Sequence, residues 1–436
     1  MRLSKPRVVI IGAGFGGLEA AKNIDNSDFE VIVIEKTNHH LFQPLLYQVA
    51  TAALSPGDIA TPVRSILRGQ KNVQVIMNEV TSIDKENQLV KMEDDSLYFD
   101  YLILAPGSRH SYFGNDNWEK HAPGLKTLED ALTIRERILV AFEQAERSYH
   151  TKDYHKHLNF VIVGGGPTGV ELAGAIAEIT EKTMLPDFPV IRKEDVNIYL
   201  IEANKDVLGP YTDNLRKYTY ETLQKMGVNV LLETMVSEIG DGYVETSSGK
   251  LNSSNIIWAA GNEASPLLKT LNCELDKGGR AVVNNDLTIK EYKNIFVIGD
   301  AANYSDDEGN PLPAVAQVAM QQARYVAKVI SEKLSPDERQ KFKYTDKGSM
   351  ATIGKAKAVA MFKGQNVSGW FAWLIWSVVH IFYIIGFRNR FRVMIEWFWY
   401  YITQKPGARL IIKNKPGETI KRQSKEKDVP ISNKQT

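Results

Sequence analysis

Short apolar runs alternate along this chain with glycine-rich turns and with segments of helical spacing, a pattern that predicts an α/β fold. The runs are rich in Val and Ile and lie at 8–11, 29–34, 99–104, 160–163, 196–201 and 294–298. Such runs are typical of parallel strands that are buried on both faces. Residues 125–148 and 313–330 have the spacing expected of helices. The order strand, helix, strand occurs twice, so we expect two Rossmann-like domains.

Two of the predicted strands run directly into a Gly-x-Gly-x-x-Gly turn. The glycines are Gly12, Gly14 and Gly17 in the first turn and Gly164, Gly166 and Gly169 in the second. The first glycine of such a turn permits the tight bend, the second lets a phosphate approach the backbone, and the third lets helix and strand pack closely. Because the helix N-terminus adds N–H donors and a positive dipole, each turn is predicted to hold a dinucleotide pyrophosphate.

An acidic residue follows each turn at the end of the next strand. Glu35 and Glu202 occupy these positions, where a carboxylate accepts hydrogen bonds from the adenosine ribose. Glu202 lies further from its turn because residues 181–195 form an insertion. A carboxylate there repels the 2′-phosphate of NADPH and favours NADH. A glycine-rich loop beside a buried strand is the alternative for either turn alone, but two complete units favour two dinucleotides that exchange electrons.

The order of the segments predicts one nucleotide domain interrupted by another. We assign 1–115 and 289–335 to the first domain, 116–157 to a helical connector, 158–288 to the second domain, 336–412 to a C-terminal region and 413–436 to a polar tail.

The amino-acid composition excludes several kinds of partner and redox centre. The formal net charge of +1 gives no reason to expect a nucleic-acid partner. The single cysteine, Cys273, excludes disulfides and paired-cysteine redox centres. His39, His40 and His380 have no partners at metal-ligand spacing, so no metal site is predicted, although His380 in its apolar run is placed to touch an apolar ligand. The first strand begins soon after Met1, and no secretory signal is expected.

The C-terminal region differs from the rest in its aromatic content. Residues 370–387 contain no Asp, Glu, Lys or Arg, and five of the seven tryptophans fall between 370 and 399. A second apolar helix face is formed by Phe391, Met394, Ile395, Phe398 and Ile402. Tryptophans beside arginines suit a bilayer interface, and the first run would reach only about 27 Å as a helix. We therefore expect 365–412 to lie in one leaflet as a monotopic anchor; a single span near 370–387 and a soluble helix pair are the alternatives.

Several longer motifs point to one family. They are FQPLLYQVATAALSP (42–56), GGGPTGVELAGA (164–175), VIGDAA (297–302), AQVAMQQ (316–322) and IGFRNRFRVMIEWFWYY (385–401). From Val8 to about Ile412 the chain resembles the membrane-bound type II NADH dehydrogenases, NADH:quinone oxidoreductases of the pyridine nucleotide-disulfide oxidoreductase-like superfamily. The resemblance implies FAD in the first domain, NADH in the inserted domain and ubiquinone or menaquinone as acceptor. It also implies the cytoplasmic face of the cell membrane and, often, a homodimer.

The same resemblance implies roles for individual residues. Asp300 would contact the flavin ribityl chain, with helix capping as the alternative. Ala316, Gln317 and Gln321 would lie at the flavin beside the quinone pocket, although surface glutamines would need no such role. Glu171 would lie near nicotinamide and flavin, where the helix dipole alone also favours an acid. Further candidates for cofactor contact are Phe15, Lys36, Ala105, Gly107, Thr168 and Gly261, with Gln43, Pro44 and Leu45 near the isoalloxazine.

The expected reaction is hydride transfer from NADH to FAD, followed by transfer of two electrons to a quinone without proton pumping. Glu171 is expected to relay a proton, and Gln317 and Gln321 to bind the quinone head group. Disulfide reductases and sulfide:quinone oxidoreductases need more than one cysteine, and soluble ferredoxin-type reductases lack the tryptophan-rich region. Another membrane-bound FAD-dependent NAD(P)H reductase and a slow-turnover FAD redox sensor are the alternatives.

Overall fold

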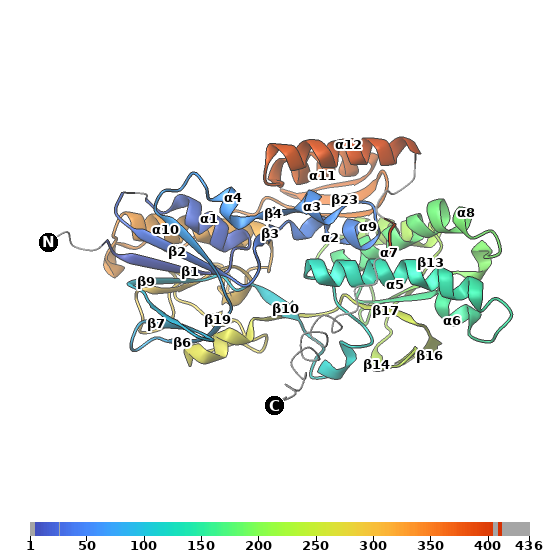
Figure 1. Cartoon of the computed structure of the whole chain (residues 1–436), viewed down its shortest axis with the longest axis horizontal. Helices are drawn as coiled ribbons and strands as arrows, with labels where there is room; N and C mark the ends of the chain where they lie inside the picture. Colours follow the sequence, from blue (N-terminus) through green and yellow to red (C-terminus); the bar gives the residue numbers. More distant parts are fainter. Residues whose placement is uncertain (1–4, 26, 404–408, 412–436) are drawn as a thin grey trace, which may run out of the picture.

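The computed structural model describes residues 5–25, 27–403 and 409–411. The expected polar tail at 413–436 and the side chain of Ile402 lie outside the described residues. Two nucleotide domains lie side by side, and the C-terminal helices lie above the junction between them (Figure 1). The expected α/β class, with one Rossmann-like domain inserted in the other, is confirmed.

The first domain is built on a five-stranded parallel sheet. Its strands, in spatial order, are β20 (Ile295–Val297), β9 (Tyr101–Leu104), β1 (Arg7–Ile11), β2 (Glu30–Glu35) and β5 (Val73–Met77). Side chains alternate along β1, so Val8 and Ile10 face the paired helices α1 (Phe15–Asn23) and α10 (Ala316–Ser331). Val9 and Ile11 face the opposite layer, formed by β6 (Val80–Asp84), β7 (Leu89–Met92) and β8 (Ser96–Tyr98).

The second domain repeats this plan on a four-stranded parallel sheet. Its strands are β13 (Val228–Leu231), β12 (Asn197–Ile201), β11 (Asn159–Val163) and β17 (Asn255–Trp258). One face packs on α5 (Leu128–Arg147), α7 (Pro167–Ile179) and α9 (Asp213–Lys225). The other face packs on Trp118 and on the small sheet of β14 (Val236–Gly240), β15 (Tyr243–Thr246) and β16 (Gly249–Asn252). The predicted connector is therefore largely one helix, α5, that belongs to this core.

Two antiparallel strands connect the domains, β10 (Ser108–His110) and β18 (Asn262–Ala264). After β18 the chain is already part of the first domain, because Leu268 and Leu271 of the helical turn η5 (Pro266–Leu271) are buried against its sheet. The packing boundary thus lies near 264, earlier in the chain than the expected residue 289. After η5 this segment has only the two-residue strand β19 (Ala281–Val282), paired with β21 (Ala302–Asn303), so no long apolar run marks the return.

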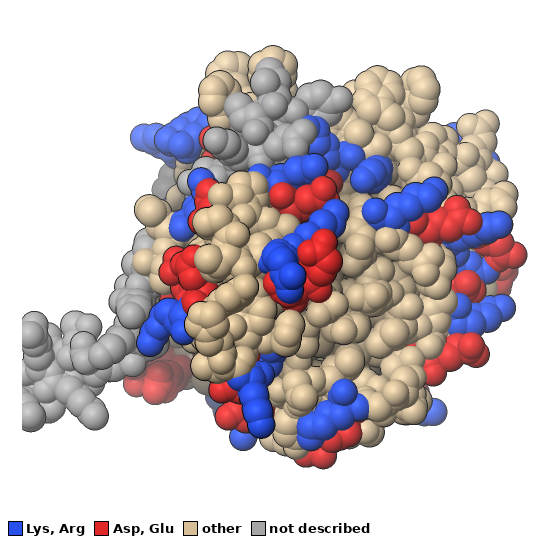
Figure 2. Space-filling view, turned by 90° about the vertical axis from the view of Figure 1, so that its right-hand side faces the viewer, with Lys and Arg blue, Asp and Glu red and all other residues tan. Residues whose placement is uncertain are grey.

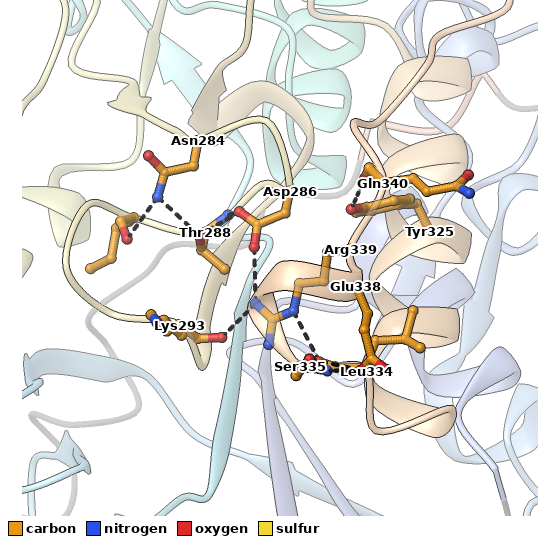
Figure 3. A network of polar contacts seen from close by, with 11 residues as sticks. Asn284, Asp286, Thr288, Lys293, Tyr325, Leu334, Ser335, Glu338, Arg339 and Gln340 are labelled. Atoms are coloured by element: carbon orange, nitrogen blue, oxygen red, sulfur yellow. Dashed lines mark hydrogen bonds and ion pairs between the residues drawn. The ribbon is translucent and has the colours of Figure 1, made fainter.

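A partly buried ion pair fixes this returning segment beside the end of α10. Arg339 donates to Asp286 at 2.9 Å, to the carbonyl of Lys293 at 2.8 Å and to that of Leu334 at 3.2 Å (Figure 3). Asp286 also accepts a hydrogen bond from Thr288. The segment that leads to Asp300 is therefore held by polar contacts as well as by packing.

Short elements between β2 and β5 carry the 42–56 motif. They are β3 (His39–Leu41), α2 (Leu46–Ala50), α3 (Pro56–Ile59), β4 (Ala60–Pro62) and α4 (Val63–Ile66). In the second domain α6 (Tyr154–Leu158) precedes β11, and α8 (Leu185–Asp187) lies in the insertion. On the end formed by this domain, basic and acidic side chains are interspersed rather than gathered by sign (Figure 2).

The C-terminal region begins with a three-stranded antiparallel sheet that the sequence patterns did not predict. Its strands are β22 (Ser349–Gly354), β23 (Lys357–Phe362) and β24 (Gln365–Gly369), and β22 packs on α7. The expected apolar helix is divided at Gly386, whose φ is +91°, into α11 (Trp370–Tyr383) and the start of α12 (Phe387–Thr403). In the described part of the chain, no helix has both the length and the apolar character that crossing a bilayer requires.

Candidate active site

The first glycine turn forms a cradle that leaves room for a phosphate. Gly12 has φ +94°, and a Cβ on Gly17 would lie 1.8 Å from the Gly12 carbonyl oxygen. Gly14 is the N-cap of α1, and a Cβ there would meet nothing within 4 Å. The first and third glycines are thus required by close packing, whereas the second leaves open space at a helix N-terminus, where an anion binds.

Glu35 is oriented by the same turn. Its carboxylate accepts hydrogen bonds from the Ala13 N–H at 2.6 Å and from the Thr37 N–H at 3.1 Å. These contacts fix the acid at the tip of β2, beside the cradle, where it can receive ribose hydroxyl groups.

The second turn reproduces this geometry in the other domain. Gly164 has φ +111°, and a Cβ on Gly169 would lie 1.8 Å from the Gly164 carbonyl oxygen, while the space at Gly166 is open. Glu202 accepts from the Gly165 N–H at 2.7 Å and from the Asn204 N–H at 2.8 Å. Two cradles with matching acids are suited to two ligands of the same chemical class.

A cavity of about 550 Å³ extends from the first cradle to the second domain. Its lining includes most of the candidate residues for the first cofactor: Gly12, Gly14, Phe15, Glu35, Lys36, Ala105, Gly107, Asp300 and Ala316. Thr168 and Glu171 border it from the second domain. Gln43 and Pro44 also border it, whereas Leu45 is buried in the core. The open phosphate space, the ribose acceptor and the volume of the cavity fit FAD.

Asp300 belongs to a chain of polar contacts that the sequence did not reveal. Ser108 donates to Asp300 at 2.6 Å and accepts from the ammonium group of Lys126 at 2.6 Å. Burial lowers the pKa of Lys126, and the nearby Asp300 opposes that shift. The side-chain amide oxygen of Gln322 accepts a hydrogen bond from the Gly299 N–H at 2.7 Å, which fixes the turn before Asp300. Ser108, Lys126 and Gln322 come from separate segments without a shared motif.

A second cavity, of about 210 Å³, lies between the two domains. Thr168, Glu171 and Asn262 border it from the second domain, and Gln43 and Asp300 border it from the first. A ligand held on the second cradle can reach the first cofactor here.

Glu171 borders both of these cavities and also a third one. Among the described residues, the Glu171 carboxylate accepts one hydrogen bond, from the Thr352 N–H at 3.4 Å. Desolvation raises the pKa of Glu171 to about 8, against a weaker lowering by that N–H. The carboxyl group is therefore mostly protonated at neutral pH and can act as a proton donor.

The third cavity, which we call the tryptophan cavity, lies between α2, α7, β22 and the C-terminal helices. Trp373, Trp376, Trp397, Tyr47 and Gln48 border it, together with Glu171. Gln48 accepts from the Trp397 indole at 2.8 Å and donates to the Tyr47 hydroxyl at 2.8 Å. The indole N–H of Trp376 is buried and has no partner among the described residues.

His380 stacks on Trp376, with 4.2 Å between the ring centroids. Its Nδ1 lies 2.7 Å from the Trp376 carbonyl oxygen, and burial lowers the pKa of His380 to about 4. The ring is therefore neutral at physiological pH and helps to hold the wall of the tryptophan cavity.

Gln317 and Gln321 lie on one face of α10, but their amides bind the backbone before β22. Gln317 donates to the Gly348 carbonyl at 3.0 Å and accepts from the Lys347 N–H. Gln321 donates to the Thr345 carbonyl at 2.9 Å and accepts from its N–H. Neither borders the three cavities described above, so their contact with a quinone stays a prediction.

Gly261 is also outside the lining of these three cavities. Its φ is +75°, and a Cβ there would lie 2.6 Å from the Phe113 ring. The structure therefore gives this glycine a packing reason, and its cofactor contact stays a prediction.

Sequence profiles of two known families match the chain. Residues 6–323 match the pyridine nucleotide-disulphide oxidoreductase family, and residues 347–404 match the NDH2 C-terminal domain. The first match covers both nucleotide domains, and the second covers the sheet β22–β24 and the two C-terminal helices.

Individual proteins extend this similarity over most of the chain. The type II NADH:quinone oxidoreductase Ndh of Mycobacterium tuberculosis is 44% identical over 93% of this chain and 90% of its own length. NdhA of the same organism is 44% identical over 90% of this chain and 86% of its own length. The structure of NDH2 from Plasmodium falciparum in complex with NADH shares the fold, with a TM-score of 0.85, 22% identity, and coverage of 94% of this chain and 100% of that one.

Proposed function

The chain belongs to the type II NADH:quinone oxidoreductases, and we propose that its three connected cavities serve FAD, the nicotinamide of NADH and the quinone head group. As a member of this family it is an enzyme that oxidises NADH, passes two electrons through FAD to a quinone and pumps no protons. The main support for this assignment is the position of Glu171, which borders all three cavities.

The 550 Å³ cavity is assigned to FAD, which supplies the redox chemistry when bound. In this proposal Gly14 and the N-terminus of α1 receive the pyrophosphate, Glu35 receives the adenosine ribose, and Asp300 receives the ribityl chain. Ser108 and Lys126 hold the Asp300 carboxylate in position. The cavity between the domains then receives the nicotinamide, so that donor and acceptor are held in contact and little orientational entropy is lost during the reaction.

The tryptophan cavity is assigned to the quinone because its walls are aromatic and because it reaches Glu171. A quinone carbonyl is the kind of acceptor that the buried Trp376 N–H lacks. Gln317 and Gln321 fix residues 345–348 and so support the start of β22, whose Thr352 borders the same cavity. We also propose that Gln317 and Gln321 bind the quinone head group directly.

We assign the outer surface of α11 and α12 to the membrane. Large apolar side chains are exposed along both helices: Trp370, Phe371, Leu374, Val378 and Phe382 on α11, and Phe387, Phe391, Met394, Ile395, Phe398 and Trp399 on α12. A patch of this kind on a soluble surface would be unusual, and it suits monotopic insertion into one leaflet. The cytoplasmic face of the membrane and a homodimer are predictions that come only with the family.

Replacing Phe371, Phe387 and Phe398 together by glutamate is expected to weaken binding to phospholipid vesicles by at least about tenfold, because three exposed apolar groups are lost. Co-sedimentation measures the effect, and NADH oxidation with a short-chain soluble quinone should persist. Met235→Glu is the matched control, since Met235 is 66% exposed on the second domain. Equal loss of binding in both variants would contradict the assignment of this surface.

Glu202→Ala is expected to raise the Kd for NADH by about tenfold and to reduce the preference for NADH over NADPH, because a charged acceptor for the ribose is removed. Titration of the purified variant with each nucleotide measures both quantities. FAD content should not change, since Glu202 belongs to the second cradle. An unchanged preference would mean that Glu202 does not face the ribose.

The function itself is tested by its two half-reactions. Anaerobic addition of NADH to the purified yellow protein should bleach the flavin absorbance, and subsequent addition of ubiquinone or menaquinone should restore it. Bleaching without recovery by either quinone would favour a redox sensor or a reductase for another acceptor. Absence of flavin from the folded protein would refute the assignment of the large cavity.

A further inference from the structure

Helix α7 carries a second carboxyl group on the face that bears Glu171. Glu178 follows Glu171 by two helical turns, and both residues border the tryptophan cavity. The Glu178 carboxylate accepts a hydrogen bond from the Lys355 N–H, at 2.5 Å, in the turn between β22 and β23. Glu171 and Glu178 therefore lie at two positions along one wall of the tryptophan cavity.

Glu178 also borders a fourth cavity, of about 230 Å³, which we call the lysine cavity. Its walls come from the end of α7, the end of α9 and the turn between β22 and β23. The charged side chains around it are Glu178, Glu181, Lys182, Lys225, Lys355 and Lys357. Glu178 and Lys355 border both cavities, so Glu178 lies between the aromatic tryptophan cavity and a charged cavity bordered by the exposed residues Glu181, Lys182 and Lys225.

The reaction requires a path along which a proton can move from solvent to the quinone. In the balanced equation, NADH, one proton and a quinone give NAD⁺ and a quinol, so each turnover takes one proton from solvent. That proton must reach a quinone oxygen between aromatic walls. Water in the tryptophan cavity would need polar partners, and Tyr47, Gln48, Thr51 and Thr352 provide them along its lining.

We propose that Glu178 is the entry point of a proton relay that ends at Glu171. A proton passes from water in the lysine cavity to the Glu178 carboxylate, then through water in the tryptophan cavity to Glu171, which delivers it to the quinone oxygen. Glu171 and Glu178 are seven residues apart, which corresponds to about 10 Å along the helix axis. This distance is too long for a direct hydrogen bond and suits a short chain of water molecules. In this relay the water molecules lie beside the quinone head group, along the wall that carries both acids. This relay rests on the function proposed above.

The surroundings of Glu178 suit a group that gains and loses a proton. Desolvation raises the pKa of Glu178, and the Lys355 N–H and the charges of Lys357, Lys355 and Lys182 oppose that shift. Two further charged groups border the same cavity: Glu181, in the π-helical turn η3 (Thr180–Met184) after α7, and Lys225, at the end of α9. Glu181 lies 3.4 Å from Lys182 and 3.6 Å from Lys193, so it is ion-paired at the surface and serves as a comparison.

The competing explanation is that Glu178 only holds the turn between β22 and β23. Glu178→Gln separates the two roles, because the glutamine oxygen can still accept the Lys355 N–H but the side chain cannot carry a proton. Glu178→Asp keeps a titratable group, and Glu181→Gln removes a nearby carboxylate, in the turn after α7, that lies outside the relay. All three are made in the full chain with FAD bound.

Stopped-flow reoxidation of the NADH-reduced flavin by quinone should be about tenfold slower in Glu178→Gln, with a larger solvent deuterium isotope effect. Small weak acids such as formate should restore part of the rate, which they would not do for a purely structural defect. Reduction of the flavin by NADH should match wild type. Glu178→Asp should retain most of the rate, and Glu181→Gln should behave as wild type.

Infrared spectroscopy gives a readout that does not depend on turnover. The pH titration of the carboxylic acid C=O band should lose one component in Glu178→Gln and none in Glu181→Gln. Wild-type reoxidation and an unchanged isotope effect in Glu178→Gln would overturn the relay while leaving the proposed function intact. If quinone failed to reoxidise the wild-type flavin, the proposed function itself would fail.

Discussion

Gly17→Ala is expected to give a protein that retains little or no FAD. The added Cβ would lie 1.8 Å from the Gly12 carbonyl oxygen, far inside van der Waals contact, and the obstacle is backbone rather than a movable side chain. Gly12 cannot withdraw easily, because it already has φ +94° and packs against the Ala105 carbonyl. Helix α1 must therefore move away from β1, and its N-terminus no longer meets the pyrophosphate.

Gly14→Ala separates the packing effect from the ligand effect. A Cβ on Gly14 meets nothing within 4 Å, so the apoprotein should keep wild-type stability while the methyl group occupies the space intended for the phosphate. Gly17→Ala should lower both FAD content and the melting temperature of the apoprotein. We expect FAD affinity to fall by at least about tenfold in each variant, and Gly57→Ala, on the exposed surface of α3, to change neither quantity.

The second cradle provides an internal comparison, since Gly169→Ala meets the same obstacle from Gly164. This variant should remain yellow but should no longer be bleached by low concentrations of NADH. Flavin absorbance after gel filtration and an anaerobic NADH titration measure the two outcomes. Full FAD content in Gly17→Ala, or normal bleaching of Gly169→Ala, would mean that the cradles do not hold the ligands assigned to them.

These two cradles could be predicted because their chemistry is local. Strand, turn, helix and acid follow each other within a short stretch, and hydrogen bonds such as that from the Ala13 N–H to Glu35 form inside the unit. The third glycine of each turn is required by an oxygen only five residues earlier. The pattern of residues thus carries nearly all the information that the geometry needs.

The other parts of the site depend on segments that meet only in the folded chain. Lys126, Ser108 and Asp300 come from the segment before α5, a connecting strand and the turn after β20, and no spacing links them. The tryptophan cavity needs Gln48 from α2 beside Trp397 from α12. The sheet β22–β24 was also missed, because its strands are only moderately apolar, so packing on α7 and α11 determines them.

The glutamines of α10 illustrate a different difficulty. Their spacing correctly placed Gln317 and Gln321 on one helix face, but spacing does not reveal what that face meets. The backbone of residues 345–348 takes both amides, and this segment has no recognisable pattern of its own. A polar face can serve the fold as easily as a ligand, and only the tertiary contacts distinguish the two.

Glu171→Gln is expected to slow reoxidation of the flavin by quinone about a hundredfold at pH 7, the usual size of a lost general acid, and to leave reduction by NADH nearly unchanged. Glutamine preserves the shape and can still accept the Thr352 N–H, but it has no transferable proton. Because desolvation raises the pKa of Glu171 to about 8, the wild-type side chain is mostly protonated at pH 7. The wild-type rate should therefore fall as pH rises through about 8, whereas the variant should show no such step.

The same pKa predicts how stability depends on pH. Between its ordinary pKa, 4.5, and about 8, Glu171 binds a proton in the native protein that the unfolded chain releases. Its contribution to the free energy of unfolding is therefore complete below about pH 4.5 and is lost as pH rises through 8. Glu171→Gln removes this dependence, so the melting temperature of the variant relative to wild type should increase from pH 5 to pH 9. A constant difference, together with an unchanged step in the rate, would mean that Glu171 does not hold the transferred proton.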